Sequence, residues 1–312
     1  MQTAAQKFVF HGSGIRLFAL QIVNILLTIV SFGLYYPWAR AAYFRFTLHE
    51  TEFAGNRFSF SGTGWELFKG LAIGLLILAA IESGLLYLSS HSILLSSFLS
   101  FMVFMLFVPF VIHASMRYRT SRISWRGIHF GYRGDLKMLM NISVKGTLLT
   151  VVTLGVYSAW YAMEVRNYVL GNVRFGSIQI KYHGKGLDYF LINLKGIVLT
   201  IFTFGLYWFW WNRNLLNYYI NKISLTQHNK TIFLKSTASG NGFSWLQITN
   251  LVIIIFTLGI ATPWTTVRTL HYIFEHIELL GELDLENIHQ TEEEYKNATG
   301  EDLMGMLDIG WV

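Results

Sequence analysis

The chain has 312 residues, of which 53% are hydrophobic, 16% are aromatic and only 13% are charged. Soluble domains carry roughly 25% charged residues, so this composition predicts a membrane protein. The chain contains no cysteine, which excludes disulfides, thiolate nucleophiles and cysteine metal sites. The net charge of +6 is unevenly divided, because the first 280 residues hold 23 basic and nine acidic residues and the remainder is acidic.

Apolar segments along the chain predict a series of helices. About 20 largely apolar residues are needed to cross a bilayer. The strongest spans lie near residues 15–36, 66–88 and 93–115, and shorter or interrupted apolar helices lie near 138–158, 187–208 and 244–262. The start of the chain lacks the ordered basic, apolar and small-residue regions of a signal peptide, so we expect the first span to be retained.

A motif with a glycine five residues before a tryptophan closes four of these apolar segments. It reads SFGLYYPW at 31–38, TLGVYSAW at 153–160, TFGLYWFW at 203–210 and TLGIATPW at 257–264. Glycine is favoured just past a helix end and proline in the first turn of a helix, so the motif is interpreted as a turn between two helices. The turn residues are Gly33, Pro37, Trp38, Gly155, Trp160, Gly205, Trp210, Gly259, Pro263 and Trp264.

Side chains within this motif have expected roles of their own. The hydroxyls of Thr153, Thr203 and Thr257 are expected to bond back to a helix carbonyl. The tryptophans are interpreted as interfacial anchors, with a substrate-stacking cage as the alternative.

Each apolar helix is followed by a more polar helix and then by short alternating segments that predict a β-hairpin. In the first unit the strands are expected to flank Gly55-Asn56. The predicted fold class is a mainly α polytopic membrane protein of about five repeats (apolar helix, polar or amphipathic helix, β-hairpin), with the hairpins forming a small extramembrane sheet. The unit boundaries are 1–64, 65–134 with two full transmembrane helices, 135–186, 187–242 and 243–286, followed by an acidic tail at 287–312.

Charge predicts the orientation of these units. Basic residues gather in the hairpin segments, whereas the SSHS connection at 89–92 is uncharged, so the hairpins are expected to be cytoplasmic. Two topologies remain open: returning helix pairs, or single crossings with an interfacial second helix. A basic face toward anionic headgroups is expected to include Arg117, Arg119, Arg122 and Arg126.

Polar residues inside the apolar helices are the candidate functional residues. Asn24 and Asn250 lie nine residues before their motif glycines, Lys145 and Lys195 lie ten before theirs, and Glu82 is the only acid within the second span after its first residue. Such recurring positions are expected to line a pathway or bind a polar solute. The alternative is hydrogen bonding between helices for the asparagines and snorkelling for the lysines.

No catalytic residue, metal site or cofactor is predicted, because no paired-carboxylate, phosphate-loop or metal-ligand pattern occurs. The first functional hypothesis is a transporter or channel-like protein that binds or passes a small solute, ion or lipid. The alternative is a scaffold that recruits lipids or proteins through its basic hairpin face and acidic tail; an enzyme is a third, less favoured hypothesis. Expected partners are anionic lipid headgroups, a second copy of the chain and a protein partner for the tail, but not nucleic acid.

Four segments together resemble the YjgN family of bacterial inner-membrane proteins, a family of unknown function. They are FHGSGIRLFALQIVNILLTIVSFGLYYPWAR, FAGNRFSFSGTG, RYRTSRISWRGIHFGYRG and DLMGMLDIGWV. The resemblance covers nearly the whole chain and implies a location in the bacterial cytoplasmic membrane. It implies no activity and no catalytic residues. The later motifs TLGVYSAW and TFGLYWFW depart from the pattern, because they lack the proline and the basic residue after it.

Overall fold

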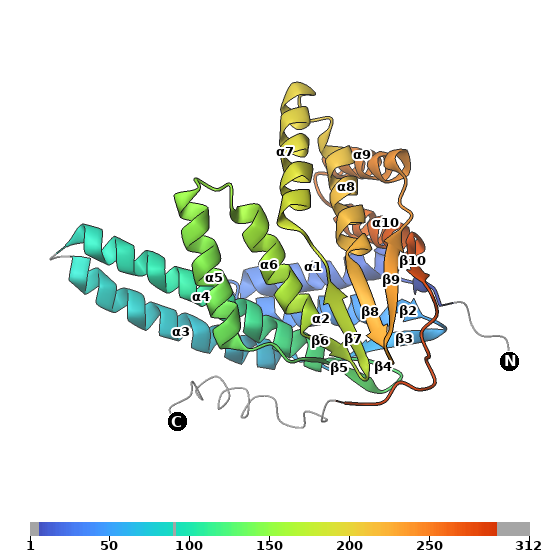
Figure 1. The fold of residues 1–312 in the computed structure, drawn as a ribbon, viewed down its shortest axis with the longest axis horizontal. Coiled ribbons are helices and arrows are strands. Elements are labelled where there is room, and N and C mark those ends of the chain that lie inside the picture. Colours follow the sequence, from blue (N-terminus) through green and yellow to red (C-terminus); the bar gives the residue numbers. More distant parts are fainter. Residues whose placement is uncertain (1–5, 90–91, 292–312) are drawn as a thin grey trace.

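A computed structural model describes residues 6–89 and 92–291, and Figure 1 shows helices extending from a sheet. The helices described are α1 (Gly14–Val30), α2 (Tyr36–His49), α3 (Gly64–Ser89), α4 (Ile93–Ser121), α5 (Leu136–Val152), α6 (Ser158–Gly171), α7 (Gly186–Phe202), α8 (Trp208–Asn221), α9 (Gly240–Phe256) and α10 (Thr262–Glu275). The strands described are β1 (Phe8–Phe10), β2 (Thr51–Phe53), β3 (Asn56–Phe60), β4 (Ile123–Trp125), β5 (Ile128–Tyr132), β6 (Val173–Phe175), β7 (Ile178–Tyr182), β8 (Ile223–Gln227), β9 (Lys230–Ser236) and β10 (Ile277–Leu280).

The strands form one antiparallel sheet in the chain order β1 to β10. Each helix pair therefore leaves this sheet and returns to it, which confirms that the hairpins gather into a single sheet. The fifth unit differs from the expectation of a hairpin, because α10 is followed within the described residues by the single strand β10. The strand β1, which precedes α1, lies at the opposite edge of the sheet.

The first hairpin turn lies one residue earlier than the sequence suggested. Phe53 pairs with Asn56, so the turn consists of Ala54 and Gly55, and Asn56 already belongs to β3. Both turn residues have positive φ values, 46° and 79°, as a type I′ hairpin turn requires. The expectation that Gly55-Asn56 forms the turn is therefore wrong by one residue.

The core lies inside the curved sheet. Trp125 is 1% exposed and clusters with Phe53, Ile178 and Ile232 from other strands and with Leu283 from the segment after β10. The indole N–H of Trp125 donates to the carbonyls of Phe53 and Asn56, at 3.3 and 3.0 Å. A segment that follows the last strand thus fills the space that the strands enclose.

The helical hairpins turn as the Gly–Trp motif predicted. Gly33, Gly155, Gly205 and Gly259 all have φ values near +90°, and the N–H of each donates to a carbonyl five residues earlier. The hydroxyl of Thr203 donates to Leu199 O at 2.7 Å, which confirms the expected back-bond; Thr153 and Thr257 make the same bond. The Thr203 oxygen also accepts from Tyr207 N at 2.9 Å, so one hydroxyl caps both helices.

We expect Thr203→Val to lower the free energy of unfolding by about 1 kcal/mol, the typical effect of losing a helix cap. Thr203→Ser should retain most of this stability, because the Ser31 hydroxyl in the first turn accepts from Tyr35 N and donates to the helix carbonyl of Thr28, three residues earlier. Denaturant titration in detergent, followed by far-UV circular dichroism, measures the difference. Equal stability of the valine and serine variants would contradict the capping role.

The two ends of the described chain meet, and this contact closes the ring of helices. The Trp264 ring in α10 lies directly over Gly14 in α1, just as Trp38 lies over Gly64 in the neighbouring hairpin. Nearby, the Gln6 side-chain amide donates to Leu283 O and accepts from Leu283 N. The first helix is therefore flanked by the last.

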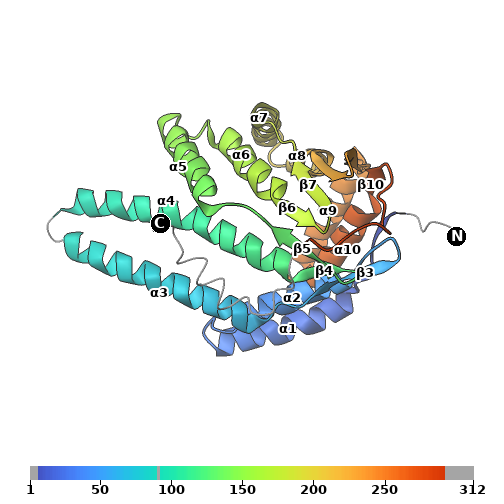
Figure 2. The same cartoon turned by 60° about the horizontal axis from the view of Figure 1, so that its bottom comes forward.

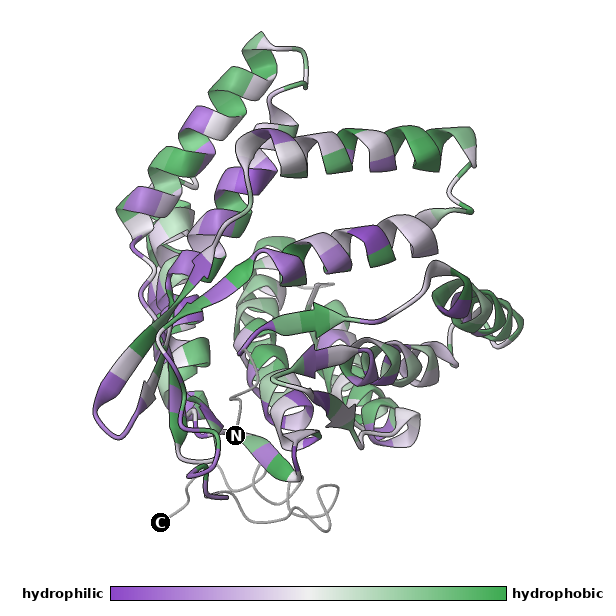
Figure 3. Ribbon diagram, turned by 90° about the vertical axis from the view of Figure 1, so that its right-hand side faces the viewer, coloured by the Kyte–Doolittle hydropathy of each residue, from purple (hydrophilic) through white to green (hydrophobic). Residues whose placement is uncertain are grey.

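Two helices described are long and apolar enough to cross a membrane, namely α3 with 26 residues and α4 with 29. They form the longest hairpin, seen to the left in Figure 2. The helices α1 and α9 are also apolar but have 17 residues each. Figure 3 shows that hydrophobic residues concentrate toward the ends of several helices away from the sheet.

Candidate functional site

A shallow groove of about 650 Å³ lies along the contact between α4 and α5. Its volume falls within the range of about 300–1,000 Å³ typical of ligand sites. Leu106 contributes from α4, and the remaining lining residues come from α5: Lys137, Met140, Asn141, Val144, Lys145, Leu148 and Leu149. The groove thus combines apolar side chains with two ammonium groups and one amide.

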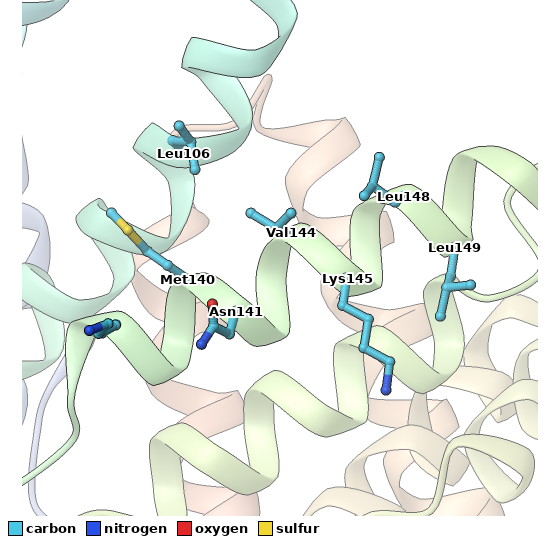
Figure 4. A pocket seen from close by; sticks show the side chains of 8 residues that line it. Leu106, Met140, Asn141, Val144, Lys145, Leu148 and Leu149 are labelled. Atoms are coloured by element: carbon cyan, nitrogen blue, oxygen red, sulfur yellow. The ribbon is translucent and has the colours of Figure 1, made fainter.

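The groove residues of α5 form two adjacent rows at a spacing of four residues, the spacing that places side chains above one another on a helix. Met140, Val144 and Leu148 make an apolar row. Lys137, Asn141 and Lys145 make a polar row, which Leu149 continues. Figure 4 shows Val144 and Leu148 on the side of α5 toward Leu106, and Asn141 and Lys145 along the other side.

The base of this groove is fixed by the local sequence. The Asp135 carboxylate caps α5 by accepting a hydrogen bond from Lys137 N at 2.9 Å, and Asp135 N–H donates to the Tyr168 hydroxyl at 2.6 Å. Lys137 therefore lies at the end of α5 beside the sheet, and Lys145 lies two turns farther out. All three polar-row side chains are exposed, so their polar groups are accessible to a ligand.

Of the sequence candidates, Lys145 is the one that lies in the groove. Its neighbours Lys137 and Asn141 were not predicted, because the predicted candidates are positions that recur at a fixed distance from the motif glycines. The four-residue spacing of Lys137, Asn141 and Lys145 indicates that they share one face of a helix, and it would have predicted both residues.

Asn250 is buried between α9 and α10. Its amide donates to Thr269 Oγ1 at 3.0 Å and to Thr265 O at 3.3 Å, and its carbonyl accepts from Arg268 at 2.9 Å. These contacts correspond to the interhelical hydrogen bonding that the sequence allowed as an alternative.

The other candidates lie apart. Asn24 is half-buried on α1, Lys195 is exposed on α7, and Glu82 on α3 accepts a hydrogen bond from Ser100 on α4 at 2.9 Å. Within the described residues, no hydrogen bond or ion pair joins any two of the five candidates. The structure thus places them on five different helices.

The four arginines of the expected basic face have different environments. Arg122 forms a largely buried ion pair with Glu66 at 2.7 Å. Arg119 lies over the Phe44 ring at 5.9 Å, and Arg126 is exposed and donates to Leu285 O at 3.4 Å. Arg117 is half-buried near the end of α4. Their role toward lipid headgroups stays a prediction.

Three of the four motif tryptophans, Trp38, Trp160 and Trp264, pack against a neighbouring hairpin. Trp160 lies over Gly186 and its ring centroid is 5.3 Å from that of Phe190, both in the next hairpin. Trp210 stacks on Tyr207 within its own turn, as Trp160 does on Tyr157, but in this hairpin the side chain that lies over the glycine of the next helix, Gly240, is Arg213.

A second polar cluster joins α6, β7 and α8. The Arg166 guanidinium lies 3.9 Å from the Tyr219 ring centroid, within cation–π range, and 5.8 Å from that of Tyr182. Burial raises the pKa of Tyr182 to about 12, so its hydroxyl is neutral at physiological pH. The cluster connects elements around the sheet.

The acidic segment after β10 crosses the hairpin turns as far as the structure describes it. Asp284 N donates to the Gln227 side chain at 2.9 Å, and the Thr291 hydroxyl donates to Gly176 O at 2.7 Å. The predicted capping box of Thr291 with Glu294, and most of the 287–312 tail, lie outside the described residues. In the described part, no group of three or more His, Asp or Glu side chains is placed to hold a metal ion.

Comparison with known proteins adds a family and a location. The model of a bacterial protein family of unknown function (DUF898) matches residues 5–181 and 210–306. Proteins named "Inner membrane protein YjgN" are similar: those of Escherichia coli O157:H7 and K12 are 29% and 28% identical over half of this chain. That match covers 38% of each relative's length.

The protein of that name from Salmonella typhimurium is 22% identical over 93% of this chain and 92% of its own length. These names support an inner-membrane location. No solved structure matches the chain.

Proposed function

This chain belongs to the DUF898 family of bacterial proteins of unknown function, and from that premise we propose that it is a multi-pass inner-membrane protein that binds an anionic phospholipid between α4 and α5. Five internal repeats, with a cytoplasmic sheet, form the framework of this proposal. The observation that carries it is the pair of rows on α5, one apolar and one polar, beside a membrane-length helix.

The lengths of α3 and α4 support membrane insertion. At 1.5 Å per residue, their 26 and 29 residues reach about 39 and 43 Å, more than the roughly 30 Å of hydrocarbon. Exposed apolar side chains along both helices, such as Leu76 and Phe104, would contact lipid.

The orientation of the groove matches that of a phospholipid. Lys137 lies at the sheet end, where headgroups would be if the sheet is extramembrane. Leu148 lies farther along α5 than either lysine, where acyl chains would be. A phosphate diester carries one negative charge, and the two ammonium groups provide its complement.

Passage of a solute, the other predicted role, has weaker geometric support. The five polar candidates lie on five helices, and the Asn250 amide is already bound by three α10 groups. A scaffold that recruits proteins through the tail depends on residues beyond 291. Lipid binding is therefore the function that the described geometry supports best.

The double variant Lys137→Gln/Lys145→Gln should bind phosphatidylglycerol about 30-fold more weakly. Each lysine near an anionic lipid surface contributes about 1 kcal/mol, and about 2 kcal/mol corresponds to that ratio. Native mass spectrometry of the detergent-solubilised protein, titrated with phosphatidylglycerol, measures the affinity.

Lys195→Gln is the matched control, because Lys195 is an exposed lysine at the equivalent motif position on α7 and does not line the groove. It should bind as the parent chain does. Phosphatidylethanolamine tests charge selectivity. Unchanged binding by the double variant, or an equal loss in Lys195→Gln, would reject the groove as the site.

A further inference from the structure

The four short helical hairpins (α1/α2, α5/α6, α7/α8 and α9/α10) have exposed hydrophobic side chains at their tips. The residue before each motif glycine is Phe32, Leu154, Phe204 or Leu258, with side chains 98%, 94%, 98% and 92% exposed. Each has φ near +50°, a conformation that bulky residues rarely adopt. Polar residues are usual at water-exposed turns, so these apolar tips require a different environment.

The backbone N–H groups of the first tip are all hydrogen-bonded within the protein. Every N–H from Ser31 to Ala39 donates to a carbonyl or, for Tyr35, to the Ser31 hydroxyl oxygen, and Pro37 has no N–H. The turn from Thr257 to Thr265 is satisfied in the same way, with Pro263 in the proline position. Ordinary loops do not enter hydrocarbon, because each unpaired backbone group there costs free energy. The backbone N–H groups of these two turns are paired, so they do not contribute this cost.

In each short hairpin, a charged residue lies at a similar distance from the tip. The first charge occurs eight to ten residues from the tip residue in at least one direction: Arg40 in the first hairpin, Lys145 and Glu164 in the third, Lys195 and Arg213 in the fourth and Arg268 in the fifth. The helices that lead into Phe32 and Leu258 have no charge within 15 residues of these tips. At 1.5 Å per residue the distance of eight to ten residues is about 12–15 Å, which equals one leaflet of a hydrocarbon layer about 30 Å thick.

The hairpin of α3 and α4 differs in both length and tip. Its helices have 26 and 29 residues, against 17 and 14 in each short hairpin. Its described tip residues, Ser89 and Ser92, are polar, and Ser92 caps α4 by accepting from Leu95 N. This hairpin is suited to cross the membrane and expose its tip to water.

We propose that the four short hairpins are re-entrant: they enter the bilayer from the sheet side, end near its midplane and return, while α3 and α4 alone among the described helices cross it. The exposed side chains of the tips then contact the acyl chains of one leaflet. This inference uses the membrane location and is independent of lipid binding in the α4/α5 groove.

The proposal also explains the recurring polar positions. Asn24 and Asn250 precede their tip residues by eight positions, and Lys145 and Lys195 precede theirs by nine. All four thus lie about one leaflet below the tip, at the level of the headgroups. Their regular spacing then marks the depth of insertion.

Single-cysteine variants test the topology without background labelling of other thiols, because the chain has no cysteine of its own. Leu154→Cys and Leu258→Cys report on two tips, Lys230→Cys on the sheet and Ser92→Cys on the far end of the α3/α4 hairpin. Each variant is reconstituted in oriented vesicles and treated with a membrane-impermeant maleimide from either side. A nitroxide on the tip cysteines then gives depth from its accessibility to oxygen and to a polar nickel complex.

We expect both tip cysteines to resist the impermeant reagent from both sides, and their nitroxides to lie about 12–15 Å deep. Lys230→Cys should react from one side and Ser92→Cys from the other. Tip labelling from the Ser92 side would mean full crossings, and tip labelling from the Lys230 side would mean hairpins outside the bilayer. Either result overturns the proposal. The tips are exposed, so these variants should fold, and gel filtration verifies this.

Discussion

Trp125→Ala should lower the free energy of unfolding by about 3–5 kcal/mol, the typical cost of truncating a buried tryptophan. The side chain is 1% exposed and lies within the sheet, with its ring 5.8 Å from those of Phe53 and Phe175. Its removal opens a cavity and leaves two strand-turn carbonyls without the indole donor. Denaturant titration in detergent, monitored by far-UV circular dichroism, measures the loss.

Trp245→Ala is the matched control, because Trp245 on α9 is 67% exposed. Its unfolding free energy in detergent should change by less than about 1 kcal/mol. A similar loss of unfolding free energy in both variants would mean that burial of Trp125 inside the sheet is not what stabilises the protein.

Asn250→Ala should cost about 1–3 kcal/mol, because it leaves buried polar groups on α10 unpaired. The Arg268 guanidinium loses its 2.9 Å acceptor, and the Thr269 hydroxyl loses a donor at 3.0 Å. The same denaturation experiment measures the effect.

Asn24→Ala provides the comparison at the equivalent motif position. The Asn24 side chain has no hydrogen-bond partner among the described residues, so its loss should cost less than about 0.5 kcal/mol. Equal losses in the two variants would show that burial between α9 and α10 is not what distinguishes them.

The sequence predicted the features that depend on neighbouring residues. The turn between paired helices follows from a glycine at positive φ, a hydroxyl that caps both helices and, in two copies, a proline in the next helix. All of these lie within eight residues, so the spacing alone reports them. The single sheet followed from the same reasoning, because a returning helix pair brings every strand pair to one side.

Features that depend on contacts between residues far apart in the chain could not be predicted from the sequence. Asn24 and Asn250 have the same spacing, and only the packing of α10 distinguishes them. The polar row of α5 becomes a groove because α4 lies beside it. Similarly, the place of β10 as a single strand depends on the segment around Leu283, which turns inward to the core.

The contact of α10 with α1 has a consequence for synthesis. The ribosome makes the Gly14 region first, but its Trp264 cover and the Leu283 partner of Gln6 are made some 250 residues later. The side of α1 that α10 covers therefore stays uncovered until the final hairpin has been made. Because the two ends of the described chain lie together, we expect a circularly permuted gene that opens between two other hairpins to encode the same arrangement.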